Sequence, residues 1–178
     1  MTIDRLNNES DAYRRARRAL WEAEVALKEQ RERVAQMRRA LPLDTESPDY
    51  PLQRVALADD APPVATSLSA LFDVPERPLV VMHFMYGAGQ REPCPMCTLW
   101  ADGYDKLVGH LSHRVNFVVA VAGDCGEFRD FARSRGWRHL TVVSTGGTSM
   151  KRDLKLEDEA GQQLPGVSVY VRRGDRVI

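Results

Sequence analysis

Apolar residues recur at helical spacing through the first quarter of the chain. From Ser10 to Leu41 there is neither glycine nor proline, and residues that favour helix dominate. Apolar residues in this stretch follow one another at alternating steps of three and four over about four heptads, with a polar interruption at Gln30. The members of this apolar seam are Tyr13, Ala16, Leu20, Ala23, Leu27, Val34, Met37 and Leu41. The pattern predicts one long amphipathic helix, which packs either on its own domain or against another subunit.

The segment after this helix is rich in proline. Pro42 ends the helix, and the apolar stretch from Leu52 to Leu57 predicts one short strand between the following prolines. We therefore expect an N-terminal amphipathic helix at residues 1–45, a linker with a short strand at 46–65, and a main domain at 66–178.

The main domain alternates apolar runs of strand length with helical patterns. Strands are predicted at Leu79–Met85, Val115–Ala122 and Leu140–Ser144, and helices at Cys94–His113 and Asp124–Gly136. The connections between these elements are short. They predict a parallel β-α-β core with right-handed crossovers.

Shorter elements flank this core. The stretch from Thr66 to Phe72 predicts a capped helical turn before the first core strand. The stretch from Thr145 to Leu164 is polar and is predicted to be mostly loop. Val167 to Val171 and Arg176 to Ile178 lie on either side of an Arg-Gly-Asp turn and predict a closing hairpin.

The candidate chemistry lies where the first core strand passes into the first core helix. Cys94 and Cys97 stand three residues apart at the start of that helix, with Pro95 between them. A helix N-terminus offers unpaired N–H groups and the positive end of the dipole, so we expect Cys94 to favour the thiolate. At this spacing Cys97 can reach back to Cys94 and close a disulfide. The pattern predicts a dithiol redox site in which one cysteine attacks a substrate disulfide and the other resolves the mixed disulfide.

Composition limits the classes of function. The 25 basic and 25 acidic residues cancel, which gives no reason to expect nucleic acid or an anionic membrane surface as a partner. The N-terminus lacks the apolar core of a signal peptide, and no apolar run has the length of a membrane span, so we expect a cytoplasmic protein. Its three cysteines are then expected to be catalytic, metal-bound or incidental, because the cytoplasm keeps ordinary thiols reduced.

These features resemble a thioredoxin-fold protein and, more closely, the bacterial family known as domain of unknown function 899. The matching stretches span most of the chain, and the segment from His83 to Asp102 is the most specific. They are Arg38–Pro42, Ser67–Phe72, His83–Gly87, Cys94–Gly103, Arg135–Trp137, Gly166–Tyr170 and Gly174–Asp175. The resemblance implies an α/β, thioredoxin-like fold, with a central mixed sheet and flanking helices after the long N-terminal helix. It also implies dithiol chemistry, for which the family has no settled substrate.

Four further residues are candidates for supporting roles. Aligned with the thioredoxin strand that carries a buried acid, His83 takes the place of the acid, where it could relay the proton that Cys97 must lose. The alternative is a histidine satisfied within the sheet. Trp100 and Asp102 stand one to two turns into the helix and could flank the dithiol, with a core position as the alternative for Trp100. Cys125 follows the neighbouring parallel strand at the same sheet edge, as either a third redox thiol or an unreactive cysteine.

Two departures from thioredoxins concern the last part of the chain. Thioredoxins place a cis-proline opposite the dithiol. Here Pro165 lies near that point, with Gly166 or Val167 as alternatives for the residue that faces the cysteines. No helix is predicted after the last hairpin, so we expect the N-terminal helix or a partner subunit to cover one face of the sheet.

Three other interpretations are open. Cys94, Cys97, His110 and His113 nearly fit a zinc-finger spacing, but a continuous helix would hold Cys97 and His110 about 20 Å apart, too far for one ion. A peroxiredoxin-like peroxidase would oxidise Cys97 to sulfenic acid and resolve it with Cys94. A non-enzymatic adaptor would act through the N-terminal helix and use the main domain as a scaffold.

The pattern favours a dithiol–disulfide oxidoreductase, with Cys94 attacking and Cys97 resolving. Its expected partners are a protein or small-molecule disulfide, a cellular thiol reductant, and a second copy of the chain bound through the N-terminal helix. The thiols carry the chemistry themselves, so neither a bound cofactor nor a metal is expected. Nucleic acid and membranes are not expected as partners.

Overall fold

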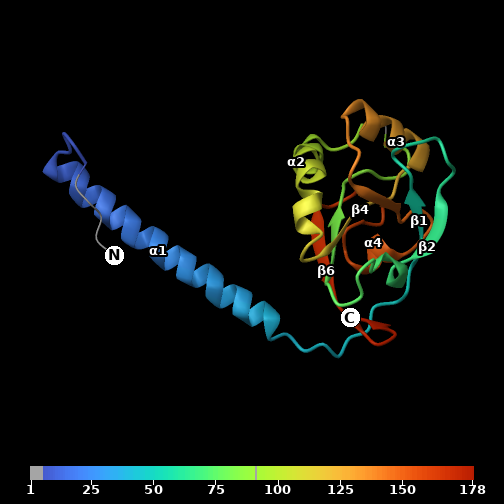
Figure 1. Ribbon diagram of the computed structural model, residues 1–178, viewed down its shortest axis with the longest axis horizontal. Helices are drawn as coiled ribbons and strands as arrows, with labels where there is room; N and C mark the ends of the chain where they lie inside the picture. The colour runs from blue at the N-terminus through green and yellow to red at the C-terminus, as the bar shows by residue number, and fades with distance from the viewer. Residues whose placement is uncertain (1–5, 91) are drawn as a thin grey trace. The chain divides into compact units, whose positions relative to one another are not determined.

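The computed structural model describes residues 6–90 and 92–178 in two compact units, Met1–Leu43 and Asp44–Ile178 (Figure 1). Residue 91 and residues 1–5, at the start of the predicted helical segment 1–45, lie outside the described residues. The first unit consists mainly of one helix, and the second has an α/β fold.

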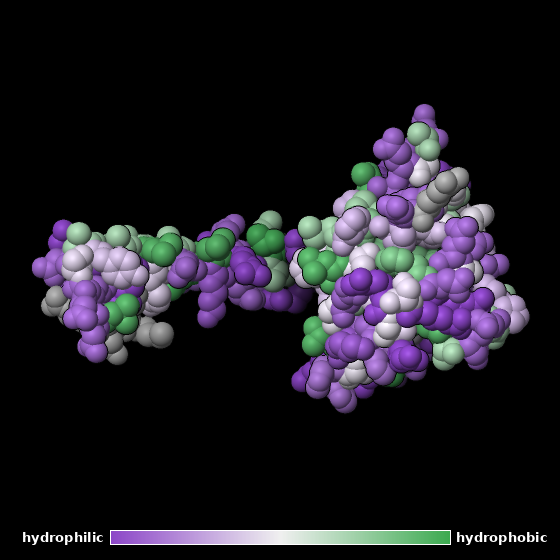
Figure 2. All heavy atoms as spheres, turned by 90° about the horizontal axis from the view of Figure 1, so that it is seen from above, coloured by the Kyte–Doolittle hydropathy of each residue, from purple (hydrophilic) through white to green (hydrophobic). Residues whose placement is uncertain are grey.

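Helix α1 (Asp11–Arg39) dominates the first unit and confirms the predicted long helix. Ser10 caps its N-terminus, because the Ser10 hydroxyl accepts the backbone N–H of Tyr13 at 3.2 Å. No residue of α1 is buried, and Leu20 and Leu27 of the apolar seam are each 60% exposed. Figure 2 shows apolar side chains following one side of this helix. The seam is therefore free to contact another apolar surface.

The described part of the second unit contains a six-stranded sheet in the order β2-β1-β5-β4-β3-β6. Its strands are β1 (Pro51–Val55), β2 (Val64–Ser67), β3 (Leu79–His83), β4 (Asn116–Val121), β5 (Thr141–Ser144) and β6 (Gly166–Tyr170). β3, β4 and β5 are parallel, whereas β1, β2 and β6 run antiparallel to their neighbours. This arrangement confirms the predicted parallel β-α-β core within a mixed sheet. The strand predicted in the 46–65 segment is β1, which pairs with β5.

Helices cover both faces of this sheet. They are α2 (Pro95–Leu111), α3 (Cys125–Ser134), α4 (Met150–Asp153) and the 3-10 turn η1 (Ser69–Leu71). One apolar core includes Ala101 from α2 and Phe128 from α3. The other includes Met150 from α4 and Leu71 from η1. β3 contributes to both cores, because side chains along a strand alternate between the two faces.

Helix α3 shows how local sequence determines these elements. The Asp124 carboxylate accepts the backbone N–H of Glu127 at 2.8 Å and so caps the start of the helix predicted from Asp124. Phe128 and Ala132, one turn apart, are fully buried. The ring of Phe128 lies 5.2 Å from that of Phe84 on the other side of the core, measured between centroids. This aromatic contact fixes α3 against the end of β3.

Three details differ from the sequence prediction. Strand β2 was not expected, because its four residues are too few and too exposed to show an apolar alternation. The predicted loop Thr145–Leu164 contains α4, a single helical turn. The closing hairpin is limited to β7 (Arg172–Arg173) and β8 (Arg176–Val177), since β6 pairs with β3 instead. No described peptide bond is cis, including the one before Pro165.

Candidate active site

Two cysteines lie at the N-terminus of α2. Cys94 is the N-cap residue, with φ −61° and ψ 124°, and Pro95 occupies the first helical position, where an N–H would have no helical partner. Cys94 is half-buried, whereas Cys97 is 4% exposed within the first turn. Both thiols are free. The pair thus has one half-buried residue, which packs against the core on the α2 side of the sheet, and one residue enclosed in that core.

The backbone of Met85 connects the end of β3 with both cysteines. The Met85 carbonyl accepts the N–H of Cys94 at 3.3 Å. The Met85 N–H donates a hydrogen bond to the sulfur of Cys97, which favours the thiolate. The segment after β3 therefore both positions the helix start and contributes to the electrostatics of Cys97.

Several groups act on the thiol of Cys97. Burial raises the pKa of Cys97 above its usual value, and the adjacent Cys94 thiol raises it further. The Met85 N–H and the charge of Lys151 oppose this increase without cancelling it. Because the thiolate is the nucleophile, Cys97 depends on these two groups to react.

Lys151 is the residue of this site that the sequence analysis missed. Its side chain is 2% exposed, and its ammonium group donates to the Phe84 carbonyl at 2.7 Å and to Gln163 Oε1 at 2.9 Å. Burial lowers the pKa of Lys151 to about 8, against the opposite effects of Glu157 and Cys97. The sequence carries no signal for this role, because Lys151 lies in a polar stretch without helical periodicity.

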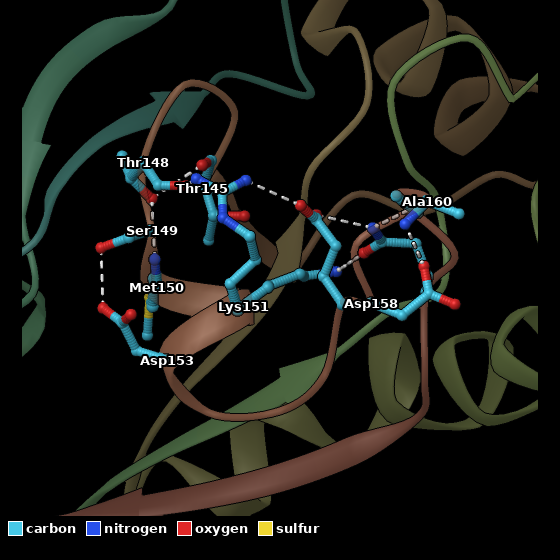
Figure 3. A network of polar contacts seen from close by, with 12 residues as sticks. Thr145, Thr148, Ser149, Met150, Lys151, Asp153, Asp158 and Ala160 are labelled. Carbon is cyan, nitrogen blue, oxygen red and sulfur yellow. Dashed lines mark hydrogen bonds and ion pairs between the residues drawn. The ribbon is translucent and has the colours of Figure 1, made fainter.

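Polar contacts hold α4, and with it Lys151, in place. The Ser149 hydroxyl donates to Asp153 Oδ2 at 2.7 Å, and the Tyr50 hydroxyl donates to the same oxygen at 2.9 Å. The Thr148 hydroxyl donates to the Thr145 carbonyl at 2.8 Å. Figure 3 shows the part of this network around Thr145, Thr148, Ser149 and Asp153. A single helical turn would not be stable alone, so these contacts define the direction from which Lys151 enters the core.

His83 ends β3, and its hydrogen bond joins β3 to β6. Its Nε2 lies 2.9 Å from the hydroxyl of Ser168, and its Nδ1 is buried with no hydrogen-bond partner among the described residues. By alternation along β3, His83 shares a face with Leu79, whereas Cys97 packs on the opposite face. Burial, followed by the charge of Lys151, lowers the pKa of His83 to about 4, which leaves the imidazole neutral at neutral pH. The geometry thus brings His83 together with Ser168 and not with the cysteines.

Asp102 and Trp100 lie on α2, and a place beside the dithiol stays a prediction for both. Asp102 Oδ1 accepts hydrogen bonds from Arg135 Nε at 3.2 Å and from Trp137 Nε1 at 2.8 Å. These contacts, with Arg135 as the larger cause, lower the pKa of Asp102 and tie α2 to the segment after α3. Trp100 is 55% exposed and stacks on Tyr104, with ring centroids 6.1 Å apart. The core position expected for Trp100 is therefore wrong.

Cys125 is the first residue of α3. It is a free, half-buried thiol that packs against the same apolar core as Cys94 and Cys97. Its sulfur lies 3.8 Å from Gln53 Oε1 on β1. A part for Cys125 as a third redox thiol stays a prediction.

The described residues offer neither a metal site nor a membrane span. Within residues 6–90 and 92–178, no group of three or more His, Cys, Asp or Glu side chains could hold a metal ion. α2 is one continuous helix that carries both Cys97 and His110, which separates these two residues of the zinc-finger pattern. In the same described ranges, no helix has both the length and the apolar character needed to cross a membrane.

Solved structures define the class of fold. The reduced 2-Cys peroxiredoxin of Plasmodium vivax matches with a TM-score of 0.55 at 12% identity, over 75% of this chain and 82% of that chain. Peroxidoxin BcpB of Mycobacterium tuberculosis matches with a TM-score of 0.53 at 18% identity, over 75% and 82% of the two chains. AhpC of Enterococcus faecalis matches with a TM-score of 0.52 at 14% identity, over 74% and 75%. At these identities the likeness establishes the fold alone, and it confirms the thioredoxin-like α/β architecture.

Within this fold class, a family model identifies the chain more closely. The model described as "Bacterial protein of unknown function (DUF899)" matches residues 3–178, so the chain belongs to this family. The match confirms the resemblance based on the segment from His83 to Asp102. No curated protein matches the chain.

Proposed function

We propose that this protein is a thiol–disulfide oxidoreductase in which Cys94 attacks a substrate disulfide and Cys97 resolves the intermediate. The observation that carries the proposal is the pair of free thiols at the start of α2, one half-buried at the N-cap and one buried in the first turn. The partly exposed Cys94 is the cysteine that a substrate disulfide would reach first. The enclosed sulfur is suited to the second, intramolecular step.

The proposed reaction has two exchange steps. The Cys94 thiolate attacks one substrate sulfur, a bond forms between Cys94 and that sulfur, and the other substrate sulfur leaves as a thiolate. Cys97 then loses its proton and attacks the Cys94 sulfur, which closes the Cys94–Cys97 disulfide and releases the second substrate thiolate. The substrate disulfide gains two electrons, and a cellular thiol reductant returns two electrons to the protein.

The surface beside the dithiol favours a protein disulfide over a small one. Met96, Leu99 and Trp100 on α2 are 59%, 63% and 55% exposed. These apolar side chains lie within two turns of Cys94 and would be covered by a peptide segment that reaches the sulfur. A thiol reductant that maintains the dithiol would act in the cytoplasm, where thiols are kept reduced.

Self-association through α1 belongs to the same proposal. The apolar seam of α1 repeats at heptad spacing and is exposed, with Leu20 and Leu27 each at 60%. A second copy of the chain carries an identical seam. Pairing of two seams would remove both from water.

A peroxiredoxin-like peroxidase is the second candidate. Peroxiredoxins are among the solved structures with this fold. In this alternative, peroxide oxidises the Cys97 thiolate to sulfenic acid and releases water. The Cys94 thiol then forms the disulfide with loss of a second water. Burial of Cys97 at 4% exposure, together with its raised pKa, favours the disulfide-exchange assignment instead.

Trapping of the intermediate tests the assignment. Reduced protein is mixed with one equivalent of a peptide disulfide, and the products are identified by mass. We expect the wild type to form the Cys94–Cys97 disulfide and Cys97→Ser to accumulate a mixed disulfide at Cys94. We expect no such adduct in Cys94→Ser. Cys125→Ser, a matched change in the same core, should behave as the wild type because the Cys125 sulfur faces Gln53.

Other outcomes identify the alternatives. Sulfenic acid at Cys97 in Cys94→Ser, formed by peroxide faster than the wild type reacts with the disulfide, would replace the proposal with the peroxidase. No reaction of either thiol with disulfide or peroxide would leave the adaptor, which acts through α1.

A further inference from the structure

We propose that Lys151 is a positioning residue for Cys97, whose buried ammonium group acts across the peptide bond between Phe84 and Met85 to stabilise the thiolate of Cys97. The inference deepens the proposed function and rests on it for the role of Cys97 in turnover. It concerns a lysine in α4, on a segment far from the dithiol in sequence.

One peptide unit connects the two groups. Its carbonyl oxygen, on Phe84, accepts a hydrogen bond from Lys151 Nζ at 2.7 Å. Its N–H, on Met85, donates to the sulfur of Cys97. A positive charge at the carbonyl end polarises the peptide and strengthens the hydrogen bond that the N–H makes. A thiolate accepts this bond better than a thiol, so the charge of Lys151 favours ionised Cys97.

The buried position of Lys151 makes its charge dependent on a nearby anion. The side chain is 2% exposed, and both hydrogen-bond acceptors of Nζ among the described residues, Phe84 O and Gln163 Oε1, are neutral. A buried ammonium group needs a compensating negative charge or else loses its proton. Glu157 and Cys97 are the two groups that favour the charged form. Gln163 also bridges Lys151 and Glu157, because its Nε2 donates to Glu157 Oε2 at 2.8 Å.

This coupling assigns a destination for the proton in the second exchange step. Cys97 gives its proton to water, and the charge of Lys151 favours this loss because it stabilises the thiolate that remains. The resulting thiolate forms its bond with the Cys94 sulfur while the bond from Cys94 to the substrate breaks, and the released substrate thiolate takes up a proton from water. The neutral Cys94–Cys97 disulfide no longer compensates the ammonium, so Lys151 releases its proton more readily in the oxidised protein.

The test measures the thiolate of Cys97 directly and does not need turnover. In the background Cys94→Ser, the rate at which iodoacetamide alkylates Cys97 is followed from about pH 6 to about pH 11 by the mass of its peptide. The other titratable groups facing the pair are His83, which is neutral throughout this range, and Glu157, which is tested as Glu157→Gln. We expect Lys151→Met to raise the midpoint by at least about one pH unit, a tenfold lower thiolate fraction at neutral pH.

A surface lysine supplies the matched control. Lys106→Met removes the same charge from α2, but the Lys106 side chain is 68% exposed and pairs with Asp105. We expect this change to move the midpoint by a few tenths of a pH unit at most, because solvent screens surface charge. An unchanged midpoint in folded Lys151→Met, or equal shifts in the two variants, would overturn the inference.

A reciprocal measurement applies even where Lys151→Met fails to fold. The carbon-13 signal of Lys151 Cε is titrated in the wild type and in Cys97→Ser, since coupling between two sites must be mutual. We expect the titration midpoint of Lys151 to fall in Cys97→Ser, and an unchanged midpoint would overturn the inference. The two proposals can fail separately. If Lys151 and Cys97 are coupled but the protein forms no Cys94–Cys97 disulfide, the proposed function is rejected and the assignment of Lys151 stands.

Discussion

The buried histidine at the end of β3 gives a prediction for stability at mildly acidic pH. Burial lowers the pKa of His83 from 6.5 to about 4, and its side chain is 1% exposed. The folded protein therefore binds no proton at His83 in a range where the unfolded chain does. The contribution of neutral His83 to the free energy of unfolding is fully present above about pH 6.5. It is lost as the pH falls towards about 4.

The size of the effect follows from the two pKa values. A difference of about 2.5 between them corresponds to about 3 kcal/mol of unfolding free energy over the whole range. Of this, about 2 kcal/mol is lost by about pH 5. Asp49, Asp102 and Asp105 have pKa values below 3.8 and contribute at lower pH.

Denaturation by urea at several pH values measures this loss. The wild type is compared with His83→Met, which has a similar volume and no titrating group, and unfolding is followed by tryptophan fluorescence. We expect the wild type to lose about 2 kcal/mol between about pH 7 and pH 5, and His83→Met to lose much less. His113→Met, at an exposed histidine, serves as the control and should follow the wild type. Equal losses in the wild type and His83→Met would refute the reasoning.

Three further predictions concern the scaffold. Asp105→Ala should lower the free energy of unfolding by about 3 kcal/mol in urea, because Asp105 Oδ1 accepts the backbone N–H groups of three successive residues, Arg138–Leu140, and they would lose their acceptor. A loss under about 1 kcal/mol would contradict this role. Phe128→Ala should lower the free energy of unfolding by about 4 kcal/mol, since the ring is fully buried among other aromatic rings. A loss of less than about 1.5 kcal/mol would contradict this packing. Leu27→Lys should shift the chain from dimer to monomer in analytical ultracentrifugation if α1 pairs through its seam, whereas an unchanged sedimentation coefficient would reject that pairing.

The starts of α2 and α3 could be predicted because their determinants are local. Pro95 and the pair of Asp124 and Glu127 act through backbone angles and hydrogen bonds within a single turn. The central strands could be predicted for a related reason. A parallel strand covered on both faces is a continuous apolar run, as in β4.

Lys151 could not be predicted because its role depends on distant contacts. Its partner Phe84 lies 67 positions away in the sequence, and α4 has only four residues, too few to show an amphipathic period. The orientation of Trp100 was missed for another reason. Helical spacing identifies α2, but it does not say how far around the helix the core extends, and here Ala101 is buried while Trp100 is exposed.

The partner of His83 likewise depended on the register between strands. Alternation along β3 predicts which side chains share a face with His83, but Ser168 lies on β6, and its position opposite β3 comes from the pairing of the two strands. The alignment with a buried thioredoxin acid placed His83 within the predicted strand Leu79–Met85, and His83 is the last residue of β3. It did not indicate that the nearest hydroxyl would be Ser168.

A redox titration of the wild-type chain in dithiothreitol buffers tests whether Cys94 and Cys97 form a redox-active dithiol. At each potential the free thiols are trapped by alkylation, and the peptide that contains Cys94 and Cys97 is analysed by mass. We expect one reversible two-electron transition confined to this peptide, at a potential between about −270 and −120 mV. If both thiols stay reduced in every oxidising buffer, the dithiol account is contradicted.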